Sequence, residues 1–178
     1  MRKMLLAFIF LAGYVMTSQA KEFEISMGYQ RIQRHGLTRE RPEEKSHHIG
    51  DRFTVDSATI LFRHFPPQAS LSGFGVELTT MERISGGLLY RFLPRGRLIP
   101  EASLGISEAG IHIVSNEDEI NARGYAAFVG IGLSYRLTKA LLVNASYKYT
   151  ERVNAVGYAG ASASWNERYS FIGLIHKF

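Results

Sequence analysis

The sequence predicts an all-β fold, an eight-stranded antiparallel barrel that spans a membrane, from three observations. After residue 16 no apolar stretch is long enough for a membrane-spanning helix, which needs about 20 residues. Eight segments alternate apolar and polar residues with the period of two that is typical of strands. Short turns alternate with longer connections between these segments, as in antiparallel barrels that cross a bilayer.

The first 20 residues have the organisation of a cleaved secretory signal peptide. Arg2 and Lys3 precede the apolar core LLAFIFLAGYVM, and the small residues Ser18 and Ala20 precede the expected cleavage point. An uncleaved interfacial anchor is the alternative. Residues 21–178 are then one barrel domain, and the absence of cysteine excludes disulfides and an N-terminal lipid-modified cysteine.

The charge balance gives little support for a nucleic-acid partner. The chain has 21 Lys and Arg against 16 Asp and Glu, and removal of Arg2 and Lys3 with the signal leaves a net charge of +3. This surplus is too small to indicate binding to a phosphate backbone, and export from the cytoplasm argues against it as well. No cofactor is expected.

The first four predicted strands are delimited by proline and by turn residues. In the first strand Phe23, Ile25 and Met27 alternate with polar residues. The second strand ends at Pro66 and the fourth ends just before Pro94, since proline cannot donate to a strand ladder. The predicted ranges are 22–31, 53–65, 71–81 and 86–93.

The last four predicted strands include the most regular alternation in the chain. In the sixth strand Val129, Ile131 and Leu133 share one face, while Gly130 and Gly132 lie on the other. A minimal turn at residues 138–139 joins the sixth strand to the seventh. The predicted ranges are 99–111, 125–137, 141–149 and 168–178.

The connections and faces of these strands predict how the barrel is oriented in a membrane. The expected long connections are residues 32–52, 112–123 and 150–167, with a shorter one at 82–85. A soluble barrel would bury its apolar face in the interior. Here one face of the strands is apolar at almost every position, which favours contact of this face with lipid. Aromatic residues are expected at the two interfaces: Tyr29, Tyr125, Tyr149 and Trp165 at one, and Phe92, Tyr135 and Phe178 at the other.

The last strand, RYSFIGLIHKF, ends the chain on Phe178 and resembles the C-terminal strand of bacterial outer-membrane barrels. The family usually has a second aromatic residue where His176 stands. The whole of residues 21–178 resembles the OmpA-like small β-barrel superfamily, including OmpX-type members without a periplasmic domain. The resemblance implies a cell outer membrane location after export through the periplasm, with turns in the periplasm and loops outside. It also implies that Phe178 is the assembly signal read by the β-barrel assembly machinery, and that lipopolysaccharide and other outer-membrane lipids are partners.

Charged residues of both signs fall on the face predicted to line the lumen. An unpaired charge buried there would be costly, so we expect these side chains to pair and to close the lumen as a salt-bridge plug. A gated ion path is the alternative. The predicted lumen residues are Glu24, Arg63, Glu77, Arg91, Glu101, Arg136 and Lys148.

Basic residues of the first expected loop form a candidate contact surface. Together with the fourth loop they could hold phosphates of lipopolysaccharide or an anionic host or environmental ligand, although solvated charges without a single partner are the alternative. The candidate residues are Arg31, Arg34, Arg39, Arg41 and Lys45. His47 and His48 are adjacent and lack the spacing of a metal site, and the acidic run 117–119 lacks the spacing of a calcium loop.

Two further functions are weighed against a structural and surface-interaction role. The first is a narrow channel or carrier for small or hydrophobic solutes, which a lateral opening in the wall would favour. The second is a lipid A-modifying enzyme. The deacylase family uses a His-x-Ser pair that the sequence lacks, since the nearest spacing is His112 to Ser115. The palmitoyltransferase family places a histidine in the first loop, where His35, His47 and His48 stand, but the helix that precedes its first strand has no room here. No catalytic residue is therefore predicted.

Overall fold

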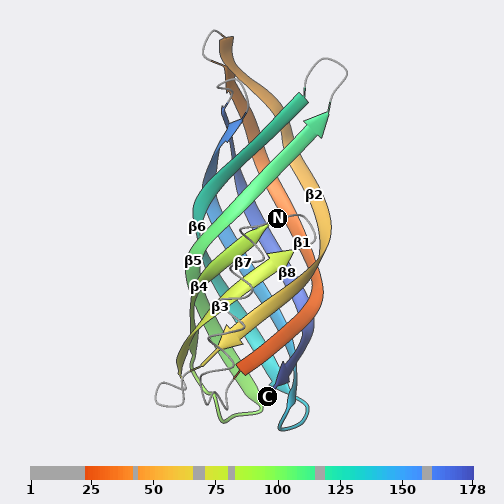
Figure 1. Ribbon diagram of the computed structural model, residues 1–178, viewed down its shortest axis with the longest axis vertical. Coiled ribbons are helices and arrows are strands. Elements are labelled where there is room, and N and C mark those ends of the chain that lie inside the picture. The colour runs from red at the N-terminus through yellow and green to blue at the C-terminus, as the bar shows by residue number, and fades with distance from the viewer. Residues whose placement is uncertain (1–22, 42–43, 66–70, 80–82, 115–118, 158–161) are drawn as a thin grey trace, which may run out of the picture.

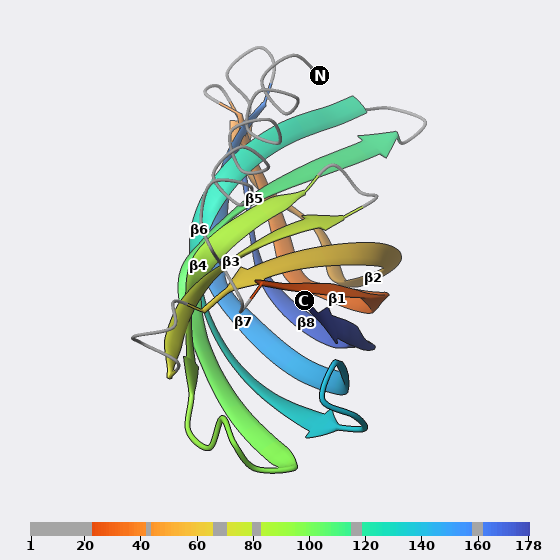
Figure 2. The ribbon, with the colours of Figure 1, turned by 60° about the horizontal axis from the view of Figure 1, so that its bottom comes forward.

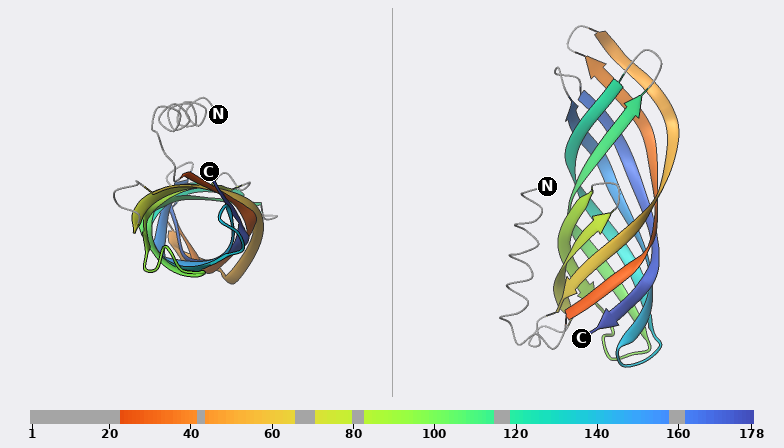
Figure 3. Two further views of the ribbon diagram at one scale, coloured as in Figure 1. Left: turned by 90° about the horizontal axis from the view of Figure 1, so that it is seen from below. Right: turned by 45° about the vertical axis from the view of Figure 1, so that its right-hand side comes forward.

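Eight antiparallel strands close into a barrel in which every strand pairs with its neighbours in the sequence and β1 pairs with β8. The computed structural model describes residues 23–41, 44–65, 71–79, 83–114, 119–157 and 162–178. Figures 1 and 2 show the tilted strands, and Figure 3 shows the closed ring from below. The strands are β1 Phe23–Arg41, β2 Glu44–His64, β3 Ser72–Thr79, β4 Ile84–Arg91, β5 Leu98–Val114, β6 Glu119–Arg136, β7 Leu141–Gly157 and β8 Ser162–Lys177. The predicted fold class is confirmed.

The two ends of the barrel differ, and we name them by their connections. The turn end carries Phe23, Phe178 and the tight turns after β4 and β6, and the hairpin end lies opposite. At the turn end the Phe178 N–H donates to the Phe23 carbonyl at 2.9 Å, and the Phe178 side chain is exposed on the outer surface. No helix among the described residues is long and apolar enough to cross a membrane. The expected signal peptide lies outside the described residues.

The alternation of side chains places the polar face inside and the apolar face outside. On β6 the outward side chains of Val129 and Ile131 are 60% and 68% exposed, whereas inward Phe128 and Ser134 are buried. A soluble barrel would show the opposite arrangement, so the exposed apolar band is a lipid-facing surface. The aromatic residues Tyr29 and Tyr125 lie on this outer surface as expected.

Three connections predicted to be long loops are instead mostly strand. In the first connection, residues 32–41 continue β1 and residues 44–52 begin β2. In the second, residues 112–114 end β5 and residues 119–123 begin β6, and in the third, residues 150–157 end β7 and residues 162–167 begin β8. The prediction was wrong because the apolar residues change face: at the hairpin end they point inward and form a cluster. This apolar cluster consists of Leu37, Ala109, Ala122, Val153, Ala155, Ala163 and Trp165. Trp165, expected at the lipid interface, is 2% exposed inside it.

The wall of the barrel is low at one place, because β3 and β4 are only 8 residues long. The N–H of Thr79 donates to the carbonyl of Arg83 at 3.1 Å, which closes their hairpin tightly. Strands β2 and β5 on either side continue well beyond it (Figure 3). Six strands therefore form the hairpin end, in the order β2, β1, β8, β7, β6, β5.

Glycines on the inward face make room for aromatic rings in the interior. Gly28 of β1 and Gly173 of β8 face each other in the ladder. A Cβ atom on Gly28 would lie 2.8 Å from the ring of Phe171, closer than a real contact allows. Phe171 is buried against this smooth strip of backbone. The glycine-rich character of the inward face thus reflects packing of the interior.

Candidate functional site

A first layer of ion pairs lies in the interior near the turn end. Arg91 of β4 donates from Nη1 to Glu24 Oε1 at 2.9 Å and from Nε to Glu101 Oε1 at 3.0 Å. Arg63 of β2 donates from Nη1 to Glu101 Oε2 at 2.9 Å. All four side chains are buried. Two arginines and two glutamates therefore compensate each other away from water, as burial of charge requires.

Neutral groups complete this first layer. The Asn144 amide donates to Ser134 Oγ at 2.9 Å, and the ring of Phe65 lies 3.7 Å from Cζ of Arg91. Sequence reasoning did not select these three residues. Asn144 could have been found, because it shares the inward parity of Lys148 on the same strand. The role of Phe65 could not, because it depends on the path of the chain at the strand end.

A second layer joins β1, β3 and β7. Lys148 donates to Glu77, and Gln30 Nε2 donates to the other oxygen of the same carboxylate at 2.8 Å. The Phe128 ring centre lies 5.0 Å from Lys148 Nζ. Glu77 and Lys148, predicted as lumen residues, are thus brought together. Gln30 was not selected from the sequence, although it lies on the polar face of β1.

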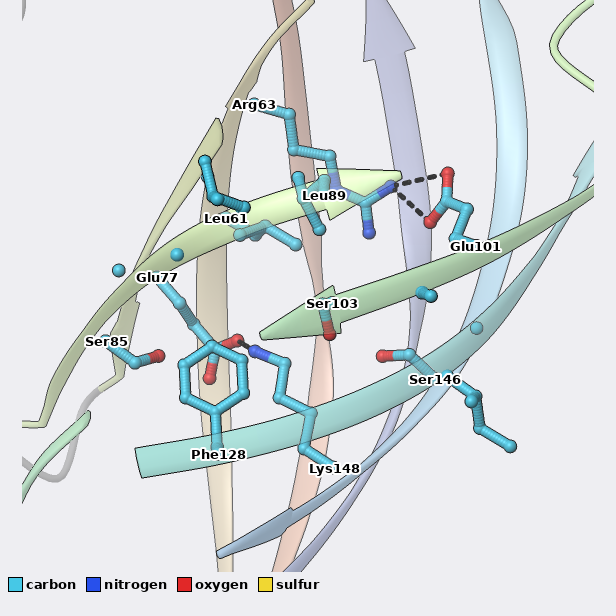
Figure 4. A pocket seen from close by; sticks show the side chains of 17 residues that line it. Leu61, Arg63, Glu77, Ser85, Leu89, Glu101, Ser103, Phe128, Ser146 and Lys148 are labelled. Atoms are coloured by element: carbon cyan, nitrogen blue, oxygen red, sulfur yellow. Dashed lines mark hydrogen bonds and ion pairs between the residues drawn. The ribbon is translucent and has the colours of Figure 1, made fainter. Parts of the chain in front are cut away.

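A small cavity separates the first layer from the second. Its volume is about 30 Å³, and its lining includes Arg63, Glu77, Ser103, Ser146 and Lys148. Figure 4 shows the hydroxyls of Ser103 and Ser146 turned toward one another between the two ion pairs. Its lining combines these polar groups with apolar side chains, and a cavity of this size has room for about two water molecules and for no larger ligand.

A third layer, nearer the hairpin end, contains an ion pair that the sequence did not reveal. Arg34 of β1 donates from Nε to Glu167 Oε1 at 2.8 Å and from Nη2 to the carbonyl of Gly110 at 2.9 Å. The indole Nε1 of Trp165 donates to the same Glu167 oxygen at 2.8 Å. Arg34 was predicted to be a loop contact residue, but it is 8% exposed and points into the barrel. The reason is that β1 continues past the predicted end of the strand.

Arg83 belongs to the same third layer. Its Nε and Nη2 donate to Ser107 Oγ at 2.9 and 2.6 Å, and its Cζ lies 3.7 Å over the ring of Tyr169. Its Nη1 lies 4.0 Å from Glu167 Oε2. Arg83 and Glu167 escaped selection because both fell in segments expected to be connections.

Arg136, the remaining predicted lumen residue, lies outside these layers. It donates from Nη1 to the carbonyl of Arg95 at 3.2 Å and from Nη2 to the carbonyl of Pro94 at 2.6 Å. The expected parity is correct, but Arg136 is the last residue of β6 and therefore reaches the turn after β4 instead of the interior. Its contacts stabilise a turn.

Comparison with known proteins identifies this architecture. No protein-family model and no curated protein matches the sequence, whereas several solved structures match the fold. Neisserial surface protein A superposes with a TM-score of 0.62 at 13% identity, over 88% of this chain and 97% of that one. OprG from Pseudomonas aeruginosa gives a TM-score of 0.59 at 14% identity, over 89% and 96%. AlkL, solved in lipid bilayers, gives 0.56 at 15% identity, over 90% and 91%.

The chain has the fold of the small outer-membrane β-barrels. The predicted resemblance to small outer-membrane β-barrels is confirmed at the level of the fold. In such barrels the short turns face the periplasm. We therefore expect the hairpin end of this barrel to face outward, and we call it the outer end.

The outer surface just beyond Tyr29 carries an exposed ion pair. Arg31 of β1 donates from Nε to Asp56 Oδ1 at 2.9 Å and from Nη2 to the hydroxyl of Tyr29 at 3.1 Å. The guanidinium lowers the pKa of the Asp56 carboxyl, chiefly through this hydrogen bond. The predicted contact residue Arg31 is therefore exposed, but it already has an acidic partner.

Three further arginines are exposed on the same side of the outer end, on β2, β7 and β8. Arg52 lies opposite His35 in the β1–β2 ladder, and Arg168 lies opposite both Gln33 and Tyr149. Within the described part of the chain, the side chains of Arg52, Arg152 and Arg168 make no hydrogen bond or ion pair. Arg52 belongs to the first expected loop, whose basic residues form the predicted contact surface, whereas sequence reasoning did not select Arg152 or Arg168. We call these three residues the outer arginines.

The remaining predicted contact residues have strand backbones but side chains that lie outside the described part of the chain. Arg39 and Arg41 belong to β1 and Lys45 belongs to β2. His35, the described candidate for a catalytic histidine, has a buried Nε2 atom with no hydrogen-bond partner in the described structure. The described residues contain no group of three metal-ligating side chains.

Proposed function

We propose that the protein is an outer-membrane barrel whose closed body is structural and whose outer end binds anionic groups at the cell surface. The observation that carries this proposal is the contrast between the inside and the outside. The interior arginines are partnered within the barrel, whereas Arg52, Arg152 and Arg168 at the outer end have no side-chain partner in the described structure.

The three interior layers support a closed body. Each layer joins at least three strands through buried polar side chains, and the cavity between the first two is only about 30 Å³. Beyond the third layer the apolar cluster fills the outer end. A hydrated ion would have to break buried ion pairs to pass, which costs several kcal/mol per ion removed from its partner.

The position of the outer arginines supports an anionic partner. Arg168 lies two residues beyond Ser170 on β8, and Ser170 is the ladder partner of Arg31. Arginines at this level, just beyond the lipid-facing band, would meet the phosphates of lipopolysaccharide under this proposal. A guanidinium binds a phosphate through paired hydrogen bonds, which an ammonium cannot do.

Conductance tests the closed body. The refolded mature protein, residues 21–178, is placed in a planar bilayer while the mass of added lipid A is followed in parallel. We expect no steady conductance and no change in lipid A mass. Steady conductance would refute the closed body, and a mass change would make the protein a lipid A-modifying enzyme.

Lipopolysaccharide binding tests the outer arginines. The variant Arg52→Gln with Arg168→Gln should bind lipopolysaccharide more weakly than the parent, and the difference should shrink at high salt, as expected for exposed charges. The matched control is Arg97→Gln with Lys139→Gln, because both residues are exposed at the turn end. Equal loss in the two double variants would show a general charge effect and remove the proposed site.

A carrier for small or hydrophobic solutes is the second candidate, and the low wall at β3 and β4 favours it. Among the described residues the wall ends at Thr79 and Arg83, so no described strand lies between β2 and β5 beyond that point. The space behind it is occupied by the third layer and the apolar cluster. Uptake of a hydrophobic solute by vesicles carrying the protein would favour the carrier even if ion conductance were absent.

A further inference from the structure

The low wall leaves two strand edges facing one opening. Strand β2 pairs with β3 only from Thr59 onward, and β5 pairs with β4 only as far as Glu108. Beyond these points the described residues of β2, from Glu44 to Ala58, have β1 as their one strand neighbour. The described residues of β5, from Ala109 to Val114, likewise pair with β6 alone. We call this opening the gap.

The ladder shows which backbone groups of β5 point into the gap. The carbonyl of Pro100 accepts from the N–H of Phe92, the residue directly after β4, so even-numbered residues of β5 direct their backbone groups toward β4. The register has no shift from Leu98 to Val114. Gly110 therefore directs its carbonyl into the gap, and this is the carbonyl that Arg34 reaches at 2.9 Å.

The same reasoning identifies the edge groups of β2. The N–H of Phe178 donates to the carbonyl of Phe23, so odd residues of β1 face β8 and even residues face β2. Glu24 pairs with Arg63, so even residues of β2 face β3 and then the gap. These edge residues are Ala58, Asp56, Thr54 and Arg52. Ser57 Oγ donates to the carbonyl of Ala58 at 3.0 Å.

On each edge a side chain thus donates a hydrogen bond to the first carbonyl that faces the gap, Ala58 on β2 and Gly110 on β5. This is expected where a neighbouring strand is missing. From these two residues toward the outer end, each edge carries a row of backbone donors and acceptors with no strand partner among the described residues. Native proteins rarely leave so long an edge unprotected, because it is a template for pairing with another chain. The apolar cluster is also open here, since Phe53 of β2 packs against it and is only partly buried.

We propose that the gap is the interface between two copies of this chain, in which β2 of each copy pairs with β5 of the other. The two edges are antiparallel to one another and face the same opening. A two-fold axis along the membrane normal therefore places each β2 edge against the partner's β5 edge. Both copies keep the same orientation in the membrane, as they must.

The pleat of the two edges agrees with this pairing. On both strands the even residues direct their backbone groups into the gap and their side chains outward, so inward residues meet inward residues across the seam. The half-buried Phe53 and Val55 would then join Ala109 and the apolar cluster of the partner.

Other partners in the gap would satisfy fewer of the unpaired backbone groups on the two edges. An extended peptide added to β2 would leave the β5 edge open, and direct pairing of β2 with β5 within one chain is blocked at its base by the β3–β4 hairpin. The dimer alone satisfies both edges of both copies with residues already present.

Cysteine cross-linking tests the interface, because the parent chain contains no cysteine. Two mature variants, Thr54→Cys and Gly110→Cys, are refolded together in vesicles and oxidised, and each is also oxidised alone. We expect a covalent dimer from the mixture and little from either variant alone. Asp56→Cys and Arg52→Cys in place of Thr54→Cys cover the neighbouring registers, and Leu104→Cys on the lipid face serves as the control for random collision.

Proline provides the second measurement. Thr54→Pro removes an N–H that faces the gap and leaves the β1–β2 ladder intact, so the variant should fold, as shown by heat-modifiable migration on a gel. Placed in the Asp56→Cys chain, it should lower the dimer yield by about tenfold, since each seam loses a hydrogen bond. The proposal is overturned if every mixture gives no more dimer than the Leu104→Cys control, or if Thr54→Cys alone cross-links as well as the mixture does. It is also overturned if Thr54→Pro leaves the yield unchanged.

Discussion

Replacement of Arg91 by methionine should destabilise the barrel strongly, because one guanidinium serves two buried carboxylates. Among the described residues Glu24 forms its ion pair with Arg91 and is 1% exposed, whereas Glu101 would keep its ion pair with Arg63. Removing one member of a buried ion pair leaves an uncompensated charge and costs about 3–5 kcal/mol. We therefore expect Arg91→Met to lose about that much free energy of unfolding.

The double variant Glu24→Gln with Arg91→Met separates this cause from a loss of packing. Its uncharged amide removes the isolated carboxylate, so it should recover a substantial part of the loss, about 2 kcal/mol. Urea unfolding of residues 21–178 in detergent or vesicles, followed by heat-modifiable migration, gives the free energies. Arg136→Met is the control, because its two hydrogen bonds to carbonyls at the turn end are worth about 1–2 kcal/mol together. The reasoning fails if Arg91→Met costs no more than Arg136→Met, or if the double variant recovers nothing.

Three smaller perturbations test other parts of the structure. Arg34→Met should cost about 3 kcal/mol by isolating Glu167, and an added Glu167→Gln should recover part of this in the same unfolding assay. Gly173→Ala should lower stability by more than about 1 kcal/mol, because a Cβ there collides with the Phe171 ring and the backbone of β1, whereas Gly110→Ala meets only ordinary contacts. The carboxyl of Asp56 should stay ionised below the usual aspartate range, since Arg31 lowers its pKa; the pair is intact at neutral pH and is lost as the pH falls through the lowered value. Carboxyl NMR of Asp56 in the parent and in Arg31→Gln measures this, and equal titration in the two proteins would contradict it.

The sequence predicted the number, order and faces of the strands. It could do so because a strand with one face on lipid and the other on the interior must alternate apolar and polar residues, and this alternation is visible within each short segment. The charged lumen residues of the first two layers followed from parity alone. Arg34 and Glu167 could not be paired from the sequence, because they lie 133 positions apart in segments where the expected alternation had ended. Arg136 shows the other limit: parity gives the face of a residue, and the depth of that residue in the barrel depends on where the strand stops.

The place where the alternation breaks has a physical meaning of its own. In the membrane-spanning part, apolar side chains such as Ile172 and Leu174 of β8 point outward, whereas farther along the same strand Trp165 and Ala163 point inward. A barrel in hydrocarbon needs an apolar outside, and a β-sheet structure in water needs an apolar inside. The inversion therefore follows from the change of solvent along each strand.

This inversion predicts the outer boundary of the hydrocarbon. The predicted strands end or begin at Arg31, Tyr125, Tyr149 and Arg168, and the ladder places Arg168 directly beside Tyr149 on one side and two residues from the partner of Arg31 on the other. Spin labels on single cysteines along β8 should show this boundary: Ile172→Cys should be accessible to oxygen in the bilayer, and Asn166→Cys to a polar nickel chelate. Equal accessibility at the two positions would mean that the inversion reflects packing alone. A boundary between them would show that the extended outer strands stand in water, where their arginines meet the surface and the open edges of β2 and β5 are accessible to another chain.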